Sequence, residues 1–422
     1  MRRRADRNSN LDVHDLPTKC VVLALKRRRF AIAHRLRKLG VARRLNLPKR
    51  SPPSNLDEVC RPLLPTAERL LPYLNFIDRS RWYSNWGELA KELERRLCAA
   101  FVLAEYGCTV ASSATDAITA ALIAVAGRGS AARPYCLMPS YTFVATASAA
   151  LNAGYTPYFV DIDPKTFAIQ PEAVVSHPAL SRAGAIVAVA PYGHTIDTMA
   201  WQKVSEQSGV PVVIDAAAGF DTFHSGEASI VRDIPIVLSF HATKVFGVGE
   251  GGAILCRDSG LAERCHRALN FGFFGSRESH IEGINGKMSE YHAAVGLAEL
   301  DGWPAKRSAF IRVAETYHRA AVLHGLGKRI LVQRKSASSY ALYFAESADA
   351  AWEASARLRS ARLGFRLWYG VGVHREPAYR EMRADPLPVT EDVAGRLIGL
   401  PVWVDMDDST VNNVVAALAG EH

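Results

Sequence analysis

The chain contains 422 residues, 49% of them hydrophobic, with a formal net charge of +9, and a chain of this size can bury a large core in a globular protein of two domains. Its seven cysteines form no Cys-x-x-Cys pair, its 13 histidines form no His-Glu-x-x-His motif, and no apolar run approaches the roughly 18 residues of a membrane span. These patterns exclude a disulfide framework, a metal site of familiar spacing and a transmembrane helix, and they predict a cytoplasmic location.

The positive charge is confined to the first part of the chain. Residues 1–60 contain 16 Lys and Arg against 5 Asp and Glu, so the rest of the chain has a net charge of −2. Residues 26–47 alternate basic and apolar side chains, which predicts one of three things: a basic amphipathic helix able to contact nucleic acid, a membrane surface or an acidic protein; a solvated extension; or a translation start assigned too far upstream. The proline-rich residues 48–53 are interpreted as a linker.

After the linker, residues 63–74 and 88–103 look helical. Residues 110–118 then place small hydroxyl side chains directly before a further helix. Free amide groups and the positive end of the dipole make such a helix start an anion site, to which Ser113 and Thr115 could add hydroxyl donors. The alternative is an ordinary Ser/Thr cap that binds no ligand.

From residue 135 onward, short apolar runs alternate with helix-like segments, which predicts a doubly wound, parallel α/β sheet. The expected strands are residues 135–138, 158–160, 185–190, 210–214 and 234–240, and the expected helices include 142–153 and 198–207. Functional side chains in such sheets gather beyond the carboxyl ends of the strands. Residues 140–143 and 192–194 fall there, together with Asp215 and Lys244.

Residues 234–256 combine a buried strand, a polar turn with Lys244, and a second short strand. A lysine between apolar residues risks losing the hydration of its ammonium, which lowers the pKa and leaves an amine able to form a Schiff base; the alternative is a lysine that reaches solvent. Gly247, Gly249 and Gly252 match Gly-x-Gly-x-x-Gly, but an apolar strand follows them where a dinucleotide fingerprint needs a helix. We therefore reject that fingerprint and predict a hairpin beside Lys244.

Asp215 ends another buried strand, where a carboxylate needs a partner such as a helix N-terminus or an arginine. Together with Lys244 and the anion site, it forms the set that pyridoxal 5'-phosphate requires: an amine for the aldehyde, an anion for the pyridine nitrogen and a cradle for the phosphate. Phe143 supplies a flat side chain for the face of the ring. The sequence thus predicts a pyridoxal-phosphate site.

Longer motifs resemble the DegT-type sugar aminotransferases, in the family's order from about residue 63 to the C-terminus. They are Pro-Ser-Tyr-Thr-Phe-Val-Ala-Thr at 139–146, Phe-Val-Asp-Ile-Asp-Pro at 159–164, Asp-Ala-Ala at 215–217, Ser-Phe-His-Ala-Thr-Lys at 239–244 and Gly-Ile-Asn-Gly-Lys-Met-Ser-Glu-Tyr-His-Ala-Ala at 283–294. The resemblance implies the aspartate-aminotransferase (type I) fold, with a large cofactor-binding domain at 61–300, built on a mostly parallel sheet, and a smaller α+β domain at 301–422. It also implies a homodimer with shared active sites.

The resemblance assigns roles to individual residues. Lys244 would be the Schiff-base lysine and general base, and Asp215 the partner of the pyridine nitrogen. The cofactor contacts would come from Ala114, Thr115, Phe143, Ser239 and Asn285, the last reaching the phosphate in the neighbouring subunit, and the substrate contacts from Tyr192, His241, Lys287 and His374.

Three positions depart from the family pattern. Ala218 stands where the family has Gln or His, Gly286 and Lys287 replace the Tyr and Arg of Asn-Tyr-Arg, and Ala114 replaces the Gly of Gly-Thr. Because Lys244 and Asp215 remain, the cofactor chemistry is expected to survive, whereas substrate contacts differ.

The sequence therefore predicts a transaminase that moves an amino group, from glutamate, to a nucleotide-linked keto-sugar of the keto-deoxyhexose type, in surface polysaccharide or secondary-metabolite sugar biosynthesis. One alternative is a sugar dehydratase, whose relatives carry histidine in place of Lys244. The other is a regulatory or binding protein that keeps the fold and uses its basic N-terminal extension.

Overall fold

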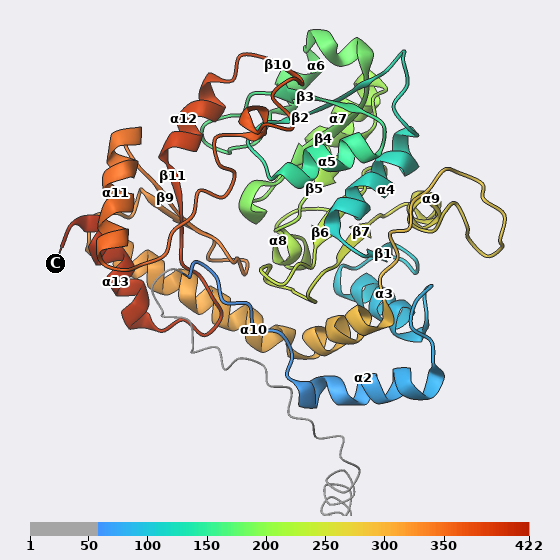
Figure 1. The fold of residues 1–422 in the computed structure, drawn as a ribbon, viewed down its shortest axis with the longest axis horizontal. Helices are drawn as coiled ribbons and strands as arrows, with labels where there is room; N and C mark the ends of the chain where they lie inside the picture. Colours follow the sequence, from blue (N-terminus) through green and yellow to red (C-terminus); the bar gives the residue numbers. More distant parts are fainter. Residues whose placement is uncertain (1–57, 422) are drawn as a thin grey trace, which may run out of the picture. The chain divides into compact units, whose positions relative to one another are not determined.

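The computed structural model describes residues 58–421, drawn in colour in Figure 1. The basic helix predicted at 26–47 and the linker predicted at 48–53 lie outside the described residues. Val59, at the end of the predicted extension, is buried, and its carbonyl accepts a hydrogen bond of 3.0 Å from the amide of Val402. This part of the predicted extension is therefore packed against the C-terminal part of the chain.

An eight-stranded sheet forms the centre of the large part of the fold, in the order β1-β7-β6-β5-β4-β2-β3-β10. From β6 to β10 in this order all neighbours are parallel, while β7 runs antiparallel to both β6 and β1. The prediction of a mostly parallel α/β sheet is confirmed, and so is the hairpin of β6 and β7. The strands are β1 (Cys108–Ala111), β2 (Tyr135–Pro139), β3 (Thr156–Val160), β4 (Ala183–Val189), β5 (Val212–Asp215), β6 (Ile236–Ser239), β7 (Gly252–Leu255) and β10 (Arg383–Ala384).

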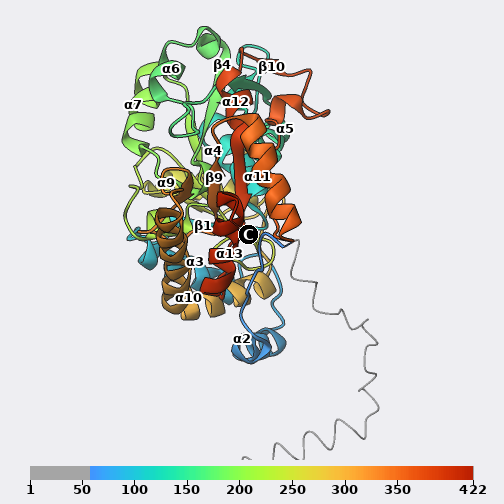
Figure 2. The same ribbon diagram turned by 90° about the vertical axis from the view of Figure 1, so that its left-hand side faces the viewer.

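Helices cover both faces of this sheet, which is why its central strands are apolar along their whole length. α4 contacts α5 and α9 on one face, and Figure 2 shows α7 on the opposite side of the sheet from α5. The helices of this part are α2 (Ala67–Ser80), α3 (Glu88–Ala100), α4 (Ala114–Ala126), α5 (Val144–Asn152), α6 (Pro171–Val175), α7 (Thr198–Ser208), α8 (Phe220–His224) and α9 (Ser259–Leu269).

A second, antiparallel sheet of three strands lies in the C-terminal part, in the order β11-β9-β8. The long helix α10 (Glu290–Leu323) contacts α3 at one end and α13 at the other, so it joins the two parts (Figure 1). The boundary predicted at residue 300 falls inside α10, and the division into two domains there stays a prediction. The other elements are β8 (Ile330–Val332), β9 (Ala341–Phe344), α11 (Ala348–Ser360), α12 (Pro388–Arg396), β11 (Leu397–Leu400) and α13 (Asp408–Ala419).

Helix boundaries differ from the predicted ones where the backbone near the helix start is extended. The helix predicted at 63–74 begins at Ala67, because Pro65 disfavours the helical conformation before it and Thr66 is extended at ψ 159°. It continues to Ser80 because Ile77 is buried and Arg81 ends it in the left-handed region at φ 54°. The helix predicted at 142–153 likewise begins two residues later, at Val144.

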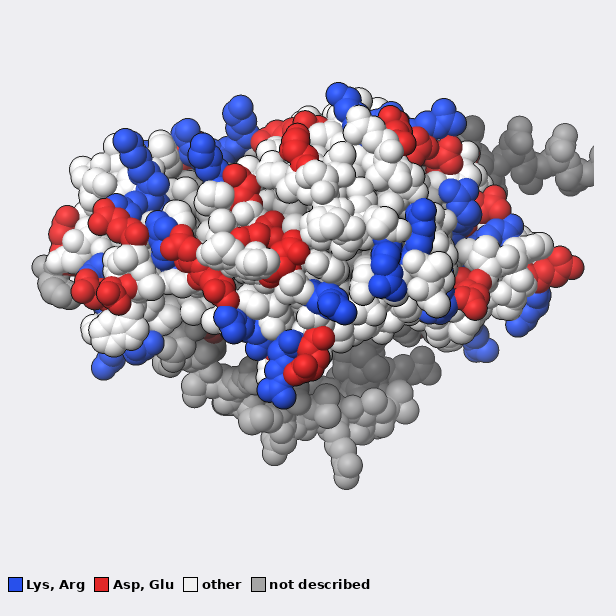
Figure 3. All heavy atoms as spheres, turned by 90° about the horizontal axis from the view of Figure 1, so that it is seen from above, with Lys and Arg blue, Asp and Glu red and all other residues white. Residues whose placement is uncertain are grey.

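Charges of both signs are mixed on the surface of the large face drawn in Figure 3. Among residues 58–421, no helix is both long enough and apolar enough to cross a membrane.

Asp221 of α8 connects three separate segments through one fully buried carboxylate. It accepts hydrogen bonds from Arg307 Nε of α10 at 2.8 and 2.9 Å and from the Ala337 amide at 2.6 Å, and it lies 3.2 Å from His224 Nδ1. Burial alone would raise the pKa of Asp221, but the hydrogen bonds from His224, Ala337 and Arg307 outweigh it and lower the pKa below its ordinary value.

We expect Asp221→Asn to lower the free energy of unfolding by about 2 kcal/mol, because the change leaves the Arg307 guanidinium without its anion. Since the folded-state pKa of Asp221 is depressed, its contribution is present above the ordinary carboxyl pKa and is lost as pH falls through the folded-state pKa. Urea denaturation of the wild type and the variant at neutral and acidic pH checks this. The difference should shrink in acid, and an equal difference at both pH values would contradict the assignment.

Candidate active site

The carboxylate of Asp215 lies at the carboxyl end of β5 and is only 5% exposed. Its Oδ2 accepts a hydrogen bond of 2.7 Å from the Thr146 hydroxyl, and its Oδ1 accepts one of 3.1 Å from the Ala217 amide. Burial raises the pKa of Asp215, and these hydrogen bonds and the charge of Lys244 only partly oppose it. No Lys, Arg or His within residues 58–421 forms an ion pair with this carboxylate.

Lys244 lies in the turn that connects β6 to β7, where its amide donates to the His241 carbonyl at 2.9 Å. The side chain is half-buried. Its amine donates a hydrogen bond of 2.7 Å to the hydroxyl of Tyr340, which directly precedes β9 of the small sheet. The amine is also close enough to Asp215 to influence its pKa. The structure therefore brings together the amine and the carboxylate that the sequence selected.

The predicted anion site has the expected local geometry. Ser113 caps α4, accepting a hydrogen bond of 3.1 Å from the Asp116 amide, so the predicted Ser cap is present. A side chain at Gly252 would come within 2.8 Å of the Ala114 amide, which means that β7 touches the start of α4 there. Because Ser239 is the β6 partner of Gly252, Ser239 lies near the first turn of α4 with Ala114 and Thr115.

Phe143 directly precedes α5 and is 60% exposed, which is unusual for a phenylalanine beside a sheet. Its turn is tied to Asp215, because the hydroxyl of Thr142 lies 3.0 Å from that of Thr146, which in turn donates to the carboxylate. The turn that carries Phe143 thus belongs to the group of residues around β5.

Asn285 and Lys287 form a short strip beside the β1–α4 turn of their own chain. Lys287 forms an isolated antiparallel β-bridge with Ala111. The Gly286 carbonyl accepts a hydrogen bond of 2.8 Å from the Ser112 amide. The Lys287 amine contacts the Asn285 side chain and lies 4.3 Å from the centre of the Phe271 ring. Burial lowers the pKa of Lys287.

The other three predicted substrate residues lie in three further environments. His241 belongs to the Lys244 turn, where its Nδ1 lies 2.8 Å from the Thr243 hydroxyl. Tyr192 is wholly buried, with φ at 57°, and its ring stacks on Tyr369 at 4.6 Å and meets Tyr340 edge-on at 5.4 Å.

His374 is held against the end of β2. Its Nδ1 lies 2.6 Å from the hydroxyl of Ser140, and its Nε2 lies 3.4 Å from Glu391. Ser140 is fully buried, so this contact fixes the histidine and does not present a serine nucleophile to solvent.

Sequence reasoning missed two residues of this group. Thr146, which holds Asp215, lies one helical turn after Phe143 within a motif already singled out, so the helical spacing was an available signal. Tyr340 had no such signal, because it lies 96 residues from Lys244 in the sequence.

These residues fit pyridoxal phosphate. A buried carboxylate without a cationic partner is costly, and a protonated pyridine nitrogen would provide one. A half-buried amine is available for an aldehyde, and the start of α4 with Ser239 offers amide and hydroxyl donors to a phosphate.

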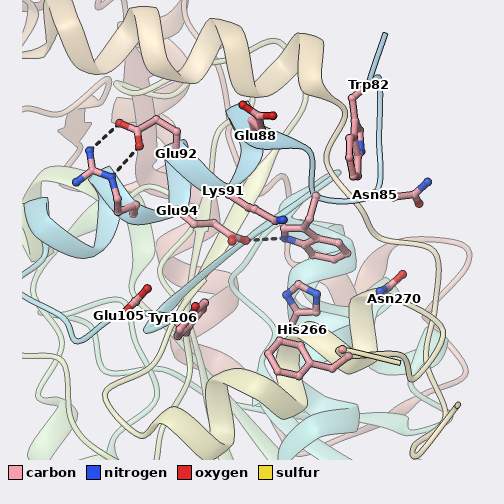
Figure 4. A pocket seen from close by; sticks show the side chains of 14 residues that line it. Trp82, Asn85, Glu88, Lys91, Glu92, Glu94, Glu105, Tyr106, His266 and Asn270 are labelled. Atoms are coloured by element: carbon pink, nitrogen blue, oxygen red, sulfur yellow. Dashed lines mark hydrogen bonds and ion pairs between the residues drawn. The ribbon is translucent and has the colours of Figure 1, made fainter. Parts of the chain in front are cut away.

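A cavity of about 600 Å³ lies between α3 and α9, away from Lys244 and Asp215 (Figure 4). At its base Glu94 accepts a hydrogen bond of 2.7 Å from Trp86 Nε1, and the Trp86 ring packs on His266 at 3.8 Å. Burial raises the pKa of Glu94 to about 7 and lowers that of His266 to about 4. None of the predicted site residues lines this cavity, so it is separate from the group around Lys244.

Comparison with known proteins agrees with this geometry. Residues 66–419 match the model of the DegT/DnrJ/EryC1/StrS aminotransferase family. The dTDP-4-amino-4,6-dideoxy-D-glucose transaminase of Shigella dysenteriae is 37% identical over 244 residues, covering 58% of this chain and 64% of that protein.

Two solved structures share the fold. A protein from Bacillus cereus described as a PLP-dependent aminotransferase superposes with a TM-score of 0.78 and 29% identity, covering 86% of this chain and 99% of its own. DesI, solved in the presence of its TDP-sugar product, superposes with a TM-score of 0.74 and 30% identity, covering 86% and 92%.

Proposed function

Because the chain belongs to the DegT/DnrJ/EryC1/StrS aminotransferase family, we propose that it transfers an amino group to the keto carbon of a nucleotide-linked sugar, with pyridoxal phosphate as cofactor. The observation that carries the proposal is the pair formed by the buried Asp215 carboxylate, which lacks a cationic partner in residues 58–421, and the half-buried amine of Lys244. A dehydratase of this family would have histidine in place of that lysine.

Bound pyridoxal phosphate supplies an aldehyde and an electron-accepting ring, through which an amino group can pass between an amino acid and a keto carbon. Lys244 would hold the aldehyde, and Asp215 would keep the ring nitrogen protonated. Thr146 and the Ala217 amide fix both oxygens of that carboxylate in place. Ser239 with Ala114 and Thr115 would hold the phosphate, and Phe143 would cover one face of the ring.

Proton transfer is the second task of Lys244. With pyridoxal phosphate bound, the free amine of Lys244 would act as the general base that takes the proton from the donor's α-carbon and returns it in a 1,3-shift. The same amine would serve in the reverse direction for the sugar ketone. One residue performs both transfers because its amine is held next to the reacting atoms throughout.

The substrate would lie against His241, His374 and Lys287, the last of which offers a cation to a nucleotide phosphate. Tyr192, predicted from the sequence as a substrate contact, is wholly buried and would instead support the site through its packing on Tyr340 and Tyr369. The amino donor is glutamate, the setting is surface-polysaccharide or secondary-metabolite sugar biosynthesis, and the enzyme works in the cytoplasm. The names of the related enzymes support a keto-deoxyhexose as the sugar.

The test is a substrate screen. Purified protein supplied with pyridoxal phosphate and glutamate is incubated with several nucleotide-linked keto-sugars, and both 2-oxoglutarate and the mass of the sugar product are measured. We expect one substrate to yield equal amounts of 2-oxoglutarate and amino sugar. Protein that takes up no cofactor would contradict the proposal. So would cofactor-loaded protein that aminates none of these sugars with any amino donor.

The active unit is a homodimer that shares its two sites. Exposed aromatic side chains support this, because aromatic residues are enriched at protein interfaces. Tyr83 and Tyr291 are each about half exposed and stack on one another with centroids 6.2 Å apart, and Phe271 beside Lys287 is also exposed.

Subunit mixing should restore activity if Asn285 serves the partner's phosphate. Lys244→Ala and Asn285→Ala proteins, mixed under conditions of verified exchange, are expected to form heterodimers with one intact site and to exceed the activity of either parent. Steady-state rates after mixing measure this. Activity that never rises above the parents would mean that each site is built from one chain, or that Asn285 contributes little.

A further inference from the structure

Tyr340 makes the hydrogen bond to the side chain of Lys244. Its hydroxyl accepts from Nζ at 2.7 Å, and the amine lies 5.2 Å from the centre of its ring. A hydroxyl that accepts a hydrogen bond from the amine restricts the orientation of that amine. The geometry points to Tyr340 as a positioning residue for Lys244, an inference that rests on the proposed function of that lysine.

The position of Tyr340 is itself fixed from several directions. Its ring meets Tyr192 edge-on at 5.4 Å and Trp368 at 5.2 Å. Its amide donates to Ser338 at 3.1 Å, and the neighbouring Ala337 amide donates to the buried Asp221. These contacts leave little freedom for the hydroxyl, so it can hold a flexible four-carbon side chain in one place.

The preceding residues are anchored to the large part of the fold as well. Gln333 Nε2 donates a hydrogen bond of 2.9 Å to the Tyr192 carbonyl, and Arg307 of α10 donates one of 2.8 Å to the Lys335 carbonyl. The segment from 333 to 340 thus links the small sheet to Tyr192 after β4, to α8 and α10, and to Lys244 after β6. Because this segment is fixed, the hydrogen bond to Tyr340 restrains the Lys244 amine that would bind the cofactor.

One consequence follows for cofactor capture, in which unprotonated Nζ attacks the aldehyde carbon, a C=N bond forms and water leaves. Without the Tyr340 hydroxyl the amine is no longer held in one orientation, so capture is slower even when the amine is unprotonated.

The test uses Tyr340→Phe, which removes only the hydroxyl and keeps the ring. Tyr369→Phe is the matched control, because it also removes a hydroxyl from this aromatic cluster. The Tyr369 hydroxyl accepts a hydrogen bond of 3.4 Å from the Tyr192 amide and makes no hydrogen bond to Lys244. The rate of pyridoxal-phosphate association with cofactor-free protein is measured by stopped-flow absorbance across pH. Thermal transitions establish that both variants fold.

For Tyr340→Phe we expect the plateau rate at high pH, where the amine is unprotonated, to fall about tenfold. Tyr369→Phe should reach the wild-type plateau. Folded Tyr340→Phe with a wild-type plateau would overturn the inference while leaving the proposed function intact. Wild-type protein that never captures the cofactor would instead refute the proposed function.

Discussion

Lys244→Ala is expected to abolish transamination while leaving the fold unchanged. The amine can both hold an aldehyde and move a proton in the way proposed, and alanine can do neither. Its hydrogen bond to Tyr340 is half-exposed, so its loss should affect stability little. Turnover of glutamate and keto-sugar, with circular dichroism as the measure of folding, checks this.

Lys203→Ala is the matched control, because Lys203 is an exposed lysine of α7 and none of the hydrogen bonds described around Lys244 and Asp215 involves it. It should retain wild-type turnover. If Lys244→Ala protein folds, binds the cofactor and still turns over at more than about one-thousandth of the wild-type rate, Lys244 is not the general base.

Asp215→Asn is expected to reduce turnover by at least about two orders of magnitude. Asparagine keeps the shape and can still accept from Thr146, but it cannot keep a pyridine nitrogen protonated, so the ring accepts electrons poorly. Single-turnover rates with glutamate measure this directly. A loss of turnover of less than tenfold would mean that this carboxylate does not keep the pyridine nitrogen of the cofactor protonated.

Although it lowers turnover, the same substitution should raise the stability of the cofactor-free protein. Because burial raises the folded-state pKa of Asp215, its charge costs stability at every pH above its ordinary carboxyl range. Its favourable contribution is present only below the unfolded-state pKa and is lost as pH rises through the folded-state pKa. We expect cofactor-free Asp215→Asn to be about 1 kcal/mol more stable at neutral pH, and no more stable in acid. A variant that is less stable at neutral pH would show that the carboxylate is already well compensated.

The sequence by itself determined the chemistry and the core of the sheet. Lys244, Asp215 and the Ser113 cap each follow or precede a short apolar run, and strand ends of a parallel sheet must converge on one edge, so local patterns predicted both the elements and their meeting point. The glycines between β6 and β7 were also assigned to a hairpin from the sequence. The residues that follow them resemble a strand, which excludes the helix that a dinucleotide-binding fingerprint requires.

The tertiary structure alone decided which groups hold those residues. Tyr340 reaches Lys244 from the small sheet, Ser140 fixes His374 across 234 residues, and Asp221 joins α8 to α10 and to the segment before β9. Such contacts depend on how two sheets and a 34-residue helix pack together. The periodicity of apolar residues in the sequence indicates only which face of a helix or strand is buried. It does not indicate which side chain from a distant part of the sequence will form a hydrogen bond with a given polar group. The buried state of Asp215, and with it the direction of its pKa, follows from that packing too.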